Sequence, residues 1–328
     1  MSGWKNKAWF FRFAARIQLV SIFHFPFSIF HFPFSIFHFP FSIFHFPFSI
    51  FHFSIFPFFH FPFPTALLLT VIINTYENPA ALDAVLARLC RGRQRADELI
   101  VADDGSGPAT REVVESWAMK APMPVKHAWQ EHVGFRRARV LNAAIATAEG
   151  EYLVFLDGDC LPSARFASDH RAMAEENYFV QCRRCFIDES AVPAAIDGSR
   201  SMLKLALSGQ ITGLFKSVRL PWPTIRRDQK LEGILGCNLG IWKQDLVDVN
   251  GYDESYEGWG KEDSDLAARL YHLGRQRKFI HGRAIVYHLN HPPASRAQLP
   301  DAMKRLEETI ASGRIKAMQG LDCHPAKP

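Results

Sequence analysis

Acidic residues are missing from the first 64 positions of this 328-residue sequence, which hold four basic side chains. The other 264 residues carry 34 basic and 33 acidic groups, so their net charge is only +1. This near-neutral balance argues against a nucleic-acid-binding protein, which would show a broad basic field. Six cysteines are spread over the same 264 residues. They are too sparse for a small scaffold held together by disulfides.

Phenylalanine is abundant only at the front, where residues 1–64 contain 22 of the 29. From residue 21 to residue 48 the heptapeptide Ser-Ile-Phe-His-Phe-Pro-Phe occurs four times without change. Its four prolines fall within 22 residues and interrupt any regular helix, including one that spans a membrane. We interpret residues 1–64 as a low-complexity segment, either disordered or produced by a start site placed too far upstream. Peripheral membrane association and metal binding by its regularly spaced histidines are the alternatives.

Residues 65–296 alternate between apolar β-branched runs and amphipathic stretches. The first four predicted strands are residues 67–75, 99–102, 125–129 and 152–156. Predicted helices lie between them, and further strands are expected at 178–187, 235–242, 277–280 and 284–287. This alternation predicts an α/β domain with a mostly parallel sheet flanked by helices and a ligand at the carboxyl ends of the strands. A C-terminal helix at 297–310 and a polar tail complete residues 297–328.

Polar clusters follow three of the predicted strands. Asn74-Thr75-Tyr76-Glu77 lies at the end of the first strand, Asp103-Asp104-Gly105-Ser106 follows the second, and Asp157-Gly158-Asp159 comes directly after the fourth, a buried strand. Two carboxylates on a rigid strand end suit a divalent cation that keeps open positions for diphosphate oxygens. Surface turns and helix caps use the same residue types, so each cluster alone is a weak signal. Their shared position at strand ends strengthens the prediction of a ligand site.

Residues 257–265 are the richest stretch for chemistry. Two glycines surround Trp259, which indicates a flexible loop that carries an aromatic platform. Glu262, Asp263 and Asp265 then crowd the start of a predicted helix. Acidic residues stabilise a helix N-terminus, but one of these could also act as a general base toward a hydroxyl group. Farther on, residues 287–291 offer two imidazoles that could complete a metal site with Asp159.

Residues 66–162 resemble the family 2 glycosyltransferases. The motifs that carry this resemblance are Val71-Ile72-Ile73-Asn74-Thr75-Tyr76, Asp103-Asp104-Gly105-Ser106 and Asp157-Gly158-Asp159. Two further segments are similar to β-1,4-galactosyltransferases and bacterial chondroitin polymerases: Phe135-Arg136-Arg137-Ala138-Arg139-Val140-Leu141-Asn142 and Gly258-Trp259-Gly260-Lys261-Glu262-Asp263-Ser264-Asp265. The resemblance covers residues 66–292 and implies a GT-A fold that uses a nucleotide sugar, most often a UDP-sugar, with Mn²⁺ or Mg²⁺.

The same resemblance implies roles for individual residues on the donor side. Thr75, Tyr76 and Asp104 would hold the uridine. Arg137 would approach the nucleotide and its phosphates. Asp157 would contact the donor and assist the metal through water or the ribose.

On the metal and acceptor side, Asp159 would hold the metal. The polymerase-like sequences favour His288 as the further ligand, whereas the galactosyltransferase spacing leaves His291 open. The resemblance assigns the residues of the acceptor site as follows: Asp263 as the base, Glu262 and Trp259 shaping the site, and Gly260 within the acceptor loop.

The implied activity is a metal-dependent, inverting transfer of a sugar to a hydroxyl of a glycan or a lipid-linked acceptor. Resemblance to bacterial relatives suggests surface polysaccharide or lipopolysaccharide synthesis in the cytoplasm, at the inner face of the membrane. Two alternatives stay open: a sugar-phosphate nucleotidyltransferase and a non-catalytic carbohydrate-binding protein. The first would normally show a Gly-rich basic loop after the first strand, which residues 74–79 lack. The second would not explain the acids at strand ends.

Overall fold

A computed structural model describes residues 67–92, 94–292 and 295–324. The interpretation of residues 1–64 lies outside these residues. In the described part of the chain, no helix combines the length and apolar character needed to cross a membrane.

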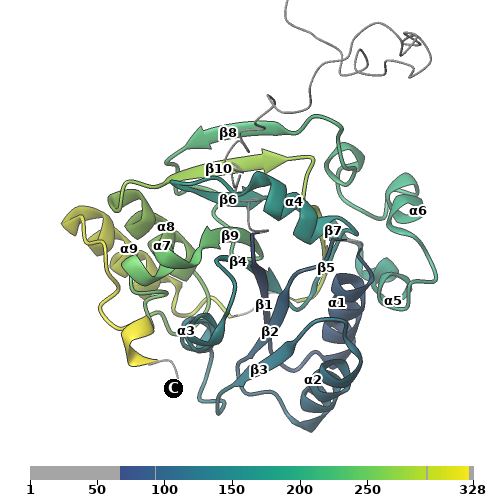
Figure 1. Cartoon of the computed structure of the whole chain (residues 1–328), viewed down its shortest axis with the longest axis horizontal. Helices are drawn as coiled ribbons and strands as arrows, with labels where there is room; N and C mark the ends of the chain where they lie inside the picture. The colour runs from purple at the N-terminus through teal and green to yellow at the C-terminus, as the bar shows by residue number, and fades with distance from the viewer. Residues whose placement is uncertain (1–66, 93, 293–294, 325–328) are drawn as a thin grey trace, which may run out of the picture. The chain divides into compact units, whose positions relative to one another are not determined.

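An eight-stranded sheet with the order β3-β2-β1-β4-β9-β6-β10-β8 forms the centre of the domain (Figure 1). One half consists of parallel strands: β1 (Leu69–Thr75), β2 (Glu98–Asp103), β3 (Val125–Trp129) and β4 (Tyr152–Asp157). The other half mixes directions and contains β9 (Asn238–Trp242), β6 (Tyr178–Cys182), β10 (Gln276–His281) and β8 (Thr224–Asp228). Strand β9 is antiparallel to both of its neighbours, β4 and β6. The predicted α/β architecture is confirmed, and its parallel part is the half built from the first four strands.

The sheet is covered on both faces, which explains the continuous apolar character of β1. Val71 and Ile73 enter one hydrophobic cluster, which includes α1 (Pro79–Arg91) and α2 (Pro108–Lys120). Ile72 points to the opposite face and joins the cluster that contains α3 (Arg137–Thr147). Alternate side chains of a strand point to opposite faces, so a strand between two helix layers is apolar throughout. Figure 1 shows α1 and α2 on one side of the sheet and α3 on the other.

The remaining helices are mostly short. They are α4 (Phe166–Met173), α5 (Val192–Ile196), α6 (Met202–Leu207), α7 (Lys243–Asp248), α8 (Glu262–His272) and α9 (Leu299–Ser312). Three single turns of 3₁₀ helix lie at Glu189–Ala191, Leu214–Lys216 and Leu321–Cys323. Helices α7, α8 and α9 share the α3 side of the sheet (Figure 1).

A second, three-stranded sheet replaces part of the predicted strand at 178–187. These residues do form strands, but as two strands rather than one: β6 ends at Cys182, and β7 (Arg184–Ile187) joins the other sheet. The small sheet has the order β5-β11-β7, with β5 (Cys160–Pro162) and β11 (Val286–Leu289) antiparallel. Pairing with β11 draws the chain out of the large sheet after Cys182. In the pairing of β11 with β5, His288 lies opposite Cys160. Cys160 directly follows Asp159, the second aspartate of the Asp-Gly-Asp motif.

Helix α9 packs against α8 and makes a buried polar contact with it. The Thr309 hydroxyl donates to Asp265 Oδ1 over 2.6 Å, and Arg269 Nε donates to Asp265 Oδ2 over 2.8 Å. None of these three side chains is exposed to solvent. The predicted division of the chain at residues 64 and 296 stays a prediction.

Replacing Thr309 should reveal how much α9 stabilises α8. We expect Thr309→Val to lower the free energy of unfolding by about 1–3 kcal/mol, because it removes a donor from a buried carboxylate. Urea denaturation followed by circular dichroism measures the change. Thr147→Val is the matched control, since among the described residues the exposed Thr147 hydroxyl bonds only to carbonyls of its own helix. Equal stability losses in the two variants would contradict the prediction.

Candidate functional site

The three polar clusters meet at one edge of the sheet, as their positions in the sequence predicted. In the registered pairs of β1, Asn74 is opposite Asp157 and Thr75 is opposite Asp103. The glycine of the Asp-Gly-Asp motif is required by close packing, since a Cβ on Gly158 would lie 3.0 Å from the Asn74 carbonyl oxygen and from Thr75 Oγ1. Thr75 is buried and its hydroxyl has no hydrogen-bond partner among the described residues. A polar edge with an unpaired donor is suited to a ligand.

Arg137, the first residue of α3, joins this edge to the start of α8. Its Nη1 lies 3.0 Å from Glu262 Oε1 and 3.0 Å from Asp263 Oδ1. Its Nη2 lies 3.4 Å from Asp157 Oδ1. The guanidinium is buried, and its planar fork allows one side chain to reach three carboxylates. Residues that are far apart in the sequence are thereby brought into one cluster.

Burial and crowding of charge change the acidity of these groups. Burial, reinforced by Asp263, raises the pKa of Glu262 to about 7 despite the opposing effect of Arg137. Burial also raises the pKa of Asp157 to about 6, against the opposing effect of Arg137. For Arg137, burial alone would lower the pKa, but the surrounding carboxylates hold it well above its ordinary value. The guanidinium is therefore a fixed positive charge in a cluster with an excess of acids.

Asp263 is held in one orientation by contacts on both of its oxygens. Oδ1 accepts from Arg137, and Oδ2 accepts from the Gly236 backbone N–H over 2.9 Å. A Cβ on residue 236 would collide with Asp263 Oδ1 and with the Arg137 guanidinium, so a side chain here would displace this carboxylate. Gly236 was not predicted as a site residue. In the sequence it is marked only by its position, as a glycine shortly before the strand β9.

Asp159 and two histidines form a candidate metal centre. Ligand atoms of Asp159, His288 and His291 all lie within 4.8 Å of one another. His291 Nε2 is 2.9 Å from Asp159 Oδ2, and His288 Nε2 is 3.7 Å from Asp159 Oδ1. Asp159 Oδ1 and His288 Nδ1 are buried and have no hydrogen-bond partner in the described part of the chain. A buried carboxylate oxygen without a hydrogen-bond partner, close to two imidazoles, fits a bound ion.

The structure places both predicted imidazoles beside Asp159, so the choice between them stays open. His291 Nδ1 is 2.8 Å from the Pro292 carbonyl oxygen, an arrangement that leaves Nε2 available to the site. The hydrogen bond to Asp159 raises the pKa of His291 to about 9, whereas burial lowers the pKa of His288. One carboxylate with two imidazoles suits Mn²⁺ better than Mg²⁺, which prefers oxygen ligands.

The predicted uridine residues contact Gln130 and His132, which the sequence did not indicate. Tyr76 is 48% exposed and stacks on His132, with ring centroids 4.5 Å apart and planes inclined by 16°. The buried Asp104 carboxylate accepts from Gln130 Nε2 over 2.5 Å and from the Arg136 backbone N–H over 2.9 Å. Residues 130–137 therefore run from the predicted nucleotide site to the Arg137 cluster. Their roles toward a nucleotide stay predictions.

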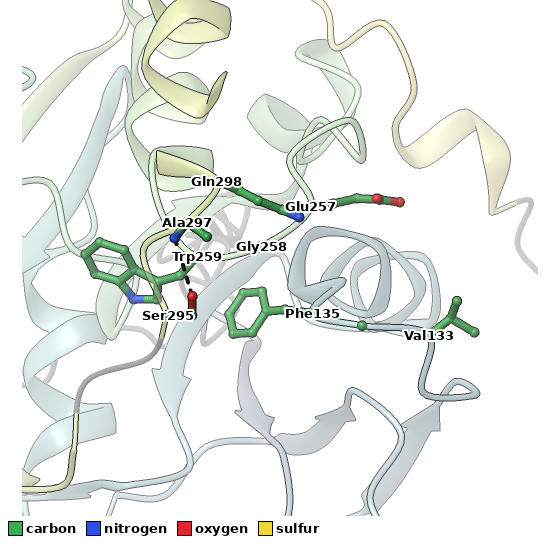
Figure 2. Close-up of a pocket in the computed structure, with 9 residues that line it drawn as sticks. Val133, Phe135, Glu257, Gly258, Trp259, Ser295, Ala297 and Gln298 are labelled. Atoms are coloured by element: carbon green, nitrogen blue, oxygen red, sulfur yellow. Dashed lines mark hydrogen bonds between the residues drawn. The ribbon is translucent and has the colours of Figure 1, made fainter. Parts of the chain in front are cut away.

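A cavity of about 450 Å³ lies beside the glycine-flanked tryptophan. Figure 2 shows Trp259, Phe135 and Gln298 among the residues that line it. Trp259 is 41% exposed and lies beneath Arg296, whose guanidinium carbon is 5.2 Å from the ring centroid. The Gly258 N–H donates to the Phe135 carbonyl over 2.9 Å, which ties this loop to the segment that precedes Arg137. Such a mixture of aromatic and polar walls suits a sugar.

The tryptophan loop has a strained backbone. Gly258 and Gly260 adopt φ values of +83° and +113°, and Lys261 adopts +76°. Left-handed backbone is unfavourable for a side chain such as lysine. Strain of this kind is found at sites where a particular loop conformation is needed.

Two family models match the chain. One is described as "Glycosyl transferase family 2" and matches residues 70–213. The other is described as "N-terminal domain of galactosyltransferase" and matches residues 220–292. Together they cover the strands and loops that carry the Arg137 cluster and the candidate metal centre.

Characterised relatives include a validoxylamine A glucosyltransferase from Streptomyces hygroscopicus subsp. jinggangensis, 28% identical over 222 residues. The match covers 63% of this chain and 52% of the relative, so the chain spans about half the length of that protein. Chondroitin synthase from Pasteurella multocida is 25% identical over 268 residues, which is 75% of this chain and 27% of the synthase.

Among solved structures, residues 1–349 of S. aureus TarS align with a TM-score of 0.54 at 17% identity. The alignment covers 79% of this chain and 68% of that one. The same fragment in complex with UDP aligns with a TM-score of 0.53. These likenesses support the fold.

The pKa of Glu262 gives a prediction about stability and pH. The folded chain keeps this carboxyl protonated up to about pH 7, whereas the unfolded chain ionises it near 4.5. The stability associated with its proton is therefore present below pH 4.5 and lost as the pH rises through 7. We expect Glu262→Gln to be more stable than the natural chain by about 1–3 kcal/mol above that window, and equal to it below.

Urea unfolding across this pH range measures the effect. Glu112→Gln serves as the control, because Glu112 is exposed on α2 and should leave the pH profile unchanged. The prediction fails if the profile of Glu262→Gln follows that of the natural chain.

Proposed function

We propose that this chain is a family 2 glycosyltransferase that transfers a sugar from a nucleotide donor, a UDP-sugar, to a hydroxyl group with inversion at the anomeric carbon. The family match favours this activity over the sugar-phosphate nucleotidyltransferase and the non-catalytic carbohydrate-binding protein. The complex of a structural neighbour with UDP makes uridine the first nucleotide to test.

The observation that supports the proposal most directly is the position of Arg137 between Asp157, which we assign to the donor, and Asp263, which we assign to the acceptor. Asp157 stands in the Asp-Gly-Asp motif at the end of β4, and Asp263 stands in the first turn of α8. One guanidinium contacts both carboxylates. Donor and acceptor must meet at a transferase centre, so a motif suited to the donor diphosphate and a base suited to the acceptor have to be neighbours.

The metal part of the proposal rests on the donor atoms of Asp159, His288 and His291. A bound Mn²⁺ or Mg²⁺ would supply positive charge that stabilises the departing diphosphate. The chain's own contribution is to bring three ligand atoms together by pairing β11 with β5. Asp157 is separated from Asp159 by Gly158 alone and is not among the three residues of this centre. We assign Asp157 to the donor.

We assign the role of general base to Asp263. Its carboxylate is partly exposed, with 19% of the side-chain surface accessible, while its two contacts fix its direction. It would accept the proton of the acceptor hydroxyl as the oxygen attacks the anomeric carbon from the face opposite the diphosphate. A single displacement of this kind inverts the configuration. Glu262 would support the arrangement from its buried position against Arg137.

The donor and acceptor assignments follow the positions of the remaining residues. Thr75, Tyr76 and Asp104 would bind the uridine at the ends of β1 and β2. Trp259 and Gly260 would shape the acceptor site beside the 450 Å³ cavity. We propose a glycan or a lipid-linked molecule as the acceptor. The reaction would then belong to surface polysaccharide or lipopolysaccharide synthesis at the cytoplasmic face of the membrane.

Substituting the proposed base should separate chemistry from binding. We expect Asp263→Asn to lower UDP release by about 10²–10⁴-fold, the usual contribution of a general base. Binding of UDP should survive, because the substitution leaves β1 and β2 untouched. Release is followed with the full chain, Mn²⁺ and a panel of UDP-sugars, and UDP binding by calorimetry. Asp301→Asn, exposed in the first turn of α9, is the control. Near-normal release by Asp263→Asn would refute its role as the base.

Removing the metal and its ligands tests the second part of the proposal. A chelator should abolish UDP release, and Mn²⁺ should restore it. Asp159→Ala should prevent this rescue. We also compare His288→Ala with His291→Ala. Loss of a residue that binds the metal directly should weaken Mn²⁺ binding by more than about 100-fold, the upper end of the effect of residues that only support a ligand. Electron paramagnetic resonance of free Mn²⁺ measures this, with His281→Ala as the control. Unchanged Mn²⁺ binding in Asp159→Ala, His288→Ala and His291→Ala would exclude this centre.

A further inference from the structure

Two buried cysteines lie close to Asp157. A carboxylate oxygen of Asp157 and the sulfurs of Cys160 and Cys237 lie within 4.8 Å of one another. Cys160 is fully buried and Cys237 is 1% exposed. Both cysteines lack a disulfide partner in the structure. Nothing in the proposed transfer reaction uses these sulfurs.

The fold brings these three residues together from separate strand ends. Asp157 ends β4 and Cys160 begins β5. Cys237 precedes β9, whose Asn238 pairs with Leu156, so Cys237 comes level with Asp157 across the antiparallel pair. The arrangement thus depends on the same strands that form the active edge, and the spacing of the cysteines in the sequence does not indicate it.

We propose that Asp157, Cys160 and Cys237 bind a thiophilic divalent cation, Zn²⁺ or Cd²⁺, at a site distinct from the Asp159 centre, and that its binding stops sugar transfer. Two sulfurs and one carboxylate oxygen give three protein ligands, the number found in zinc sites that keep a fourth position open. The neighbouring centre offers one carboxylate and two imidazoles instead. Softer cations prefer the sulfur set, so the two sites select different ions.

The surroundings of the sulfurs support ligation. Arg184 Nη1 lies 3.7 Å from Cys237 Sγ, so a guanidinium can donate to this sulfur when it carries negative charge. Hydrogen bonds of this kind orient and tune metal ligands. When the cation binds, it replaces the protons of the two thiols, and both protons leave to the solvent. No electron is transferred in this step.

Inhibition follows from the shared carboxylate. Asp157 Oδ1 now lies 3.4 Å from Arg137 Nη2. A cation held by the cysteines would draw Asp157 away from this contact and place a second positive charge beside the donor site. Binding of the cation goes beyond the proposed function, whereas its effect on transfer rests on that function. The two parts therefore need separate measurements.

Cadmium is the probe for binding, because cadmium–thiolate bonds give an ultraviolet charge-transfer absorption. The experiment uses the full chain with Cys323→Ser, which removes the exposed thiol. All six cysteines lie outside the histidine-rich repeat, so metal bound by the repeat gives no sulfur signal. We expect one sulfur-bound Cd²⁺ per chain. The signal should disappear in Cys160→Ser and in Cys237→Ser, and persist in Cys185→Ser and His291→Ala.

A missing signal, or one that survives both cysteine substitutions, would overturn the site. If these variants do not fold, zinc X-ray absorption of the Cys323→Ser chain decides the question. Two sulfur neighbours per zinc support the site, and a shell of only oxygen and nitrogen overturns it.

The effect on transfer is measured as the ratio of UDP release with and without Zn²⁺ in excess Mn²⁺. We expect this ratio to fall as Zn²⁺ is added, to recover with a chelator, and to stay near unity in Cys237→Ser. A sulfur signal with an unchanged ratio would overturn the inhibition and keep the site. If the chain releases no UDP under any condition, the proposed function fails, while the Cd²⁺ signal still tests the site.

Discussion

The buried guanidinium of Arg137 is the interaction on which the site depends. It contacts Asp157 from the parallel half of the sheet and Glu262 and Asp263 from α8. A buried charge of this kind adds little net stability, whereas leaving it without any carboxylate partner typically costs about 3–5 kcal/mol. Its main effect is therefore to fix geometry, because the carboxylates can approach one another only while the guanidinium lies between them.

Two glycines make this geometry sterically possible. Gly158 lets the Asp-Gly-Asp turn pass the end of β1, where a Cβ would press on Asn74 and Thr75. Gly236 lets the chain before β9 donate its N–H to Asp263, where a Cβ would collide with that carboxylate. Backbone close to backbone or to a charged group is a situation in which only glycine fits. The acids and the arginine thus depend on residues that have no chemistry of their own.

Local patterns in the sequence predicted much of this fold. Alternating apolar runs predicted the first four strands, and the rule that carboxyl ends of parallel strands share an edge predicted the meeting of Thr75, Asp103 and Asp157. Contacts set by antiparallel or between-sheet pairing escaped prediction. Three features were not predicted: the end of β6 at Cys182, the pairing of His288 with Cys160, and the stacking of His132 on Tyr76. Each depends on contacts between segments that are distant in the sequence and share no hydrophobic pattern. Their register is decided by tertiary packing, which periodicity does not encode.

The excess of acids explains why the edge of the sheet favours cations. Asp157, Glu262 and Asp263 share one guanidinium, and the pKa values of Asp157 and Glu262 rise because burial and like charges oppose full ionisation. Asp159 then turns toward the imidazoles, while Asp157 has the two sulfurs beside it. The single glycine between these acids separates a set of oxygen and nitrogen ligands from a set that contains sulfur. The two candidate cation sites at this edge thus differ in the neighbours that each aspartate meets in the fold.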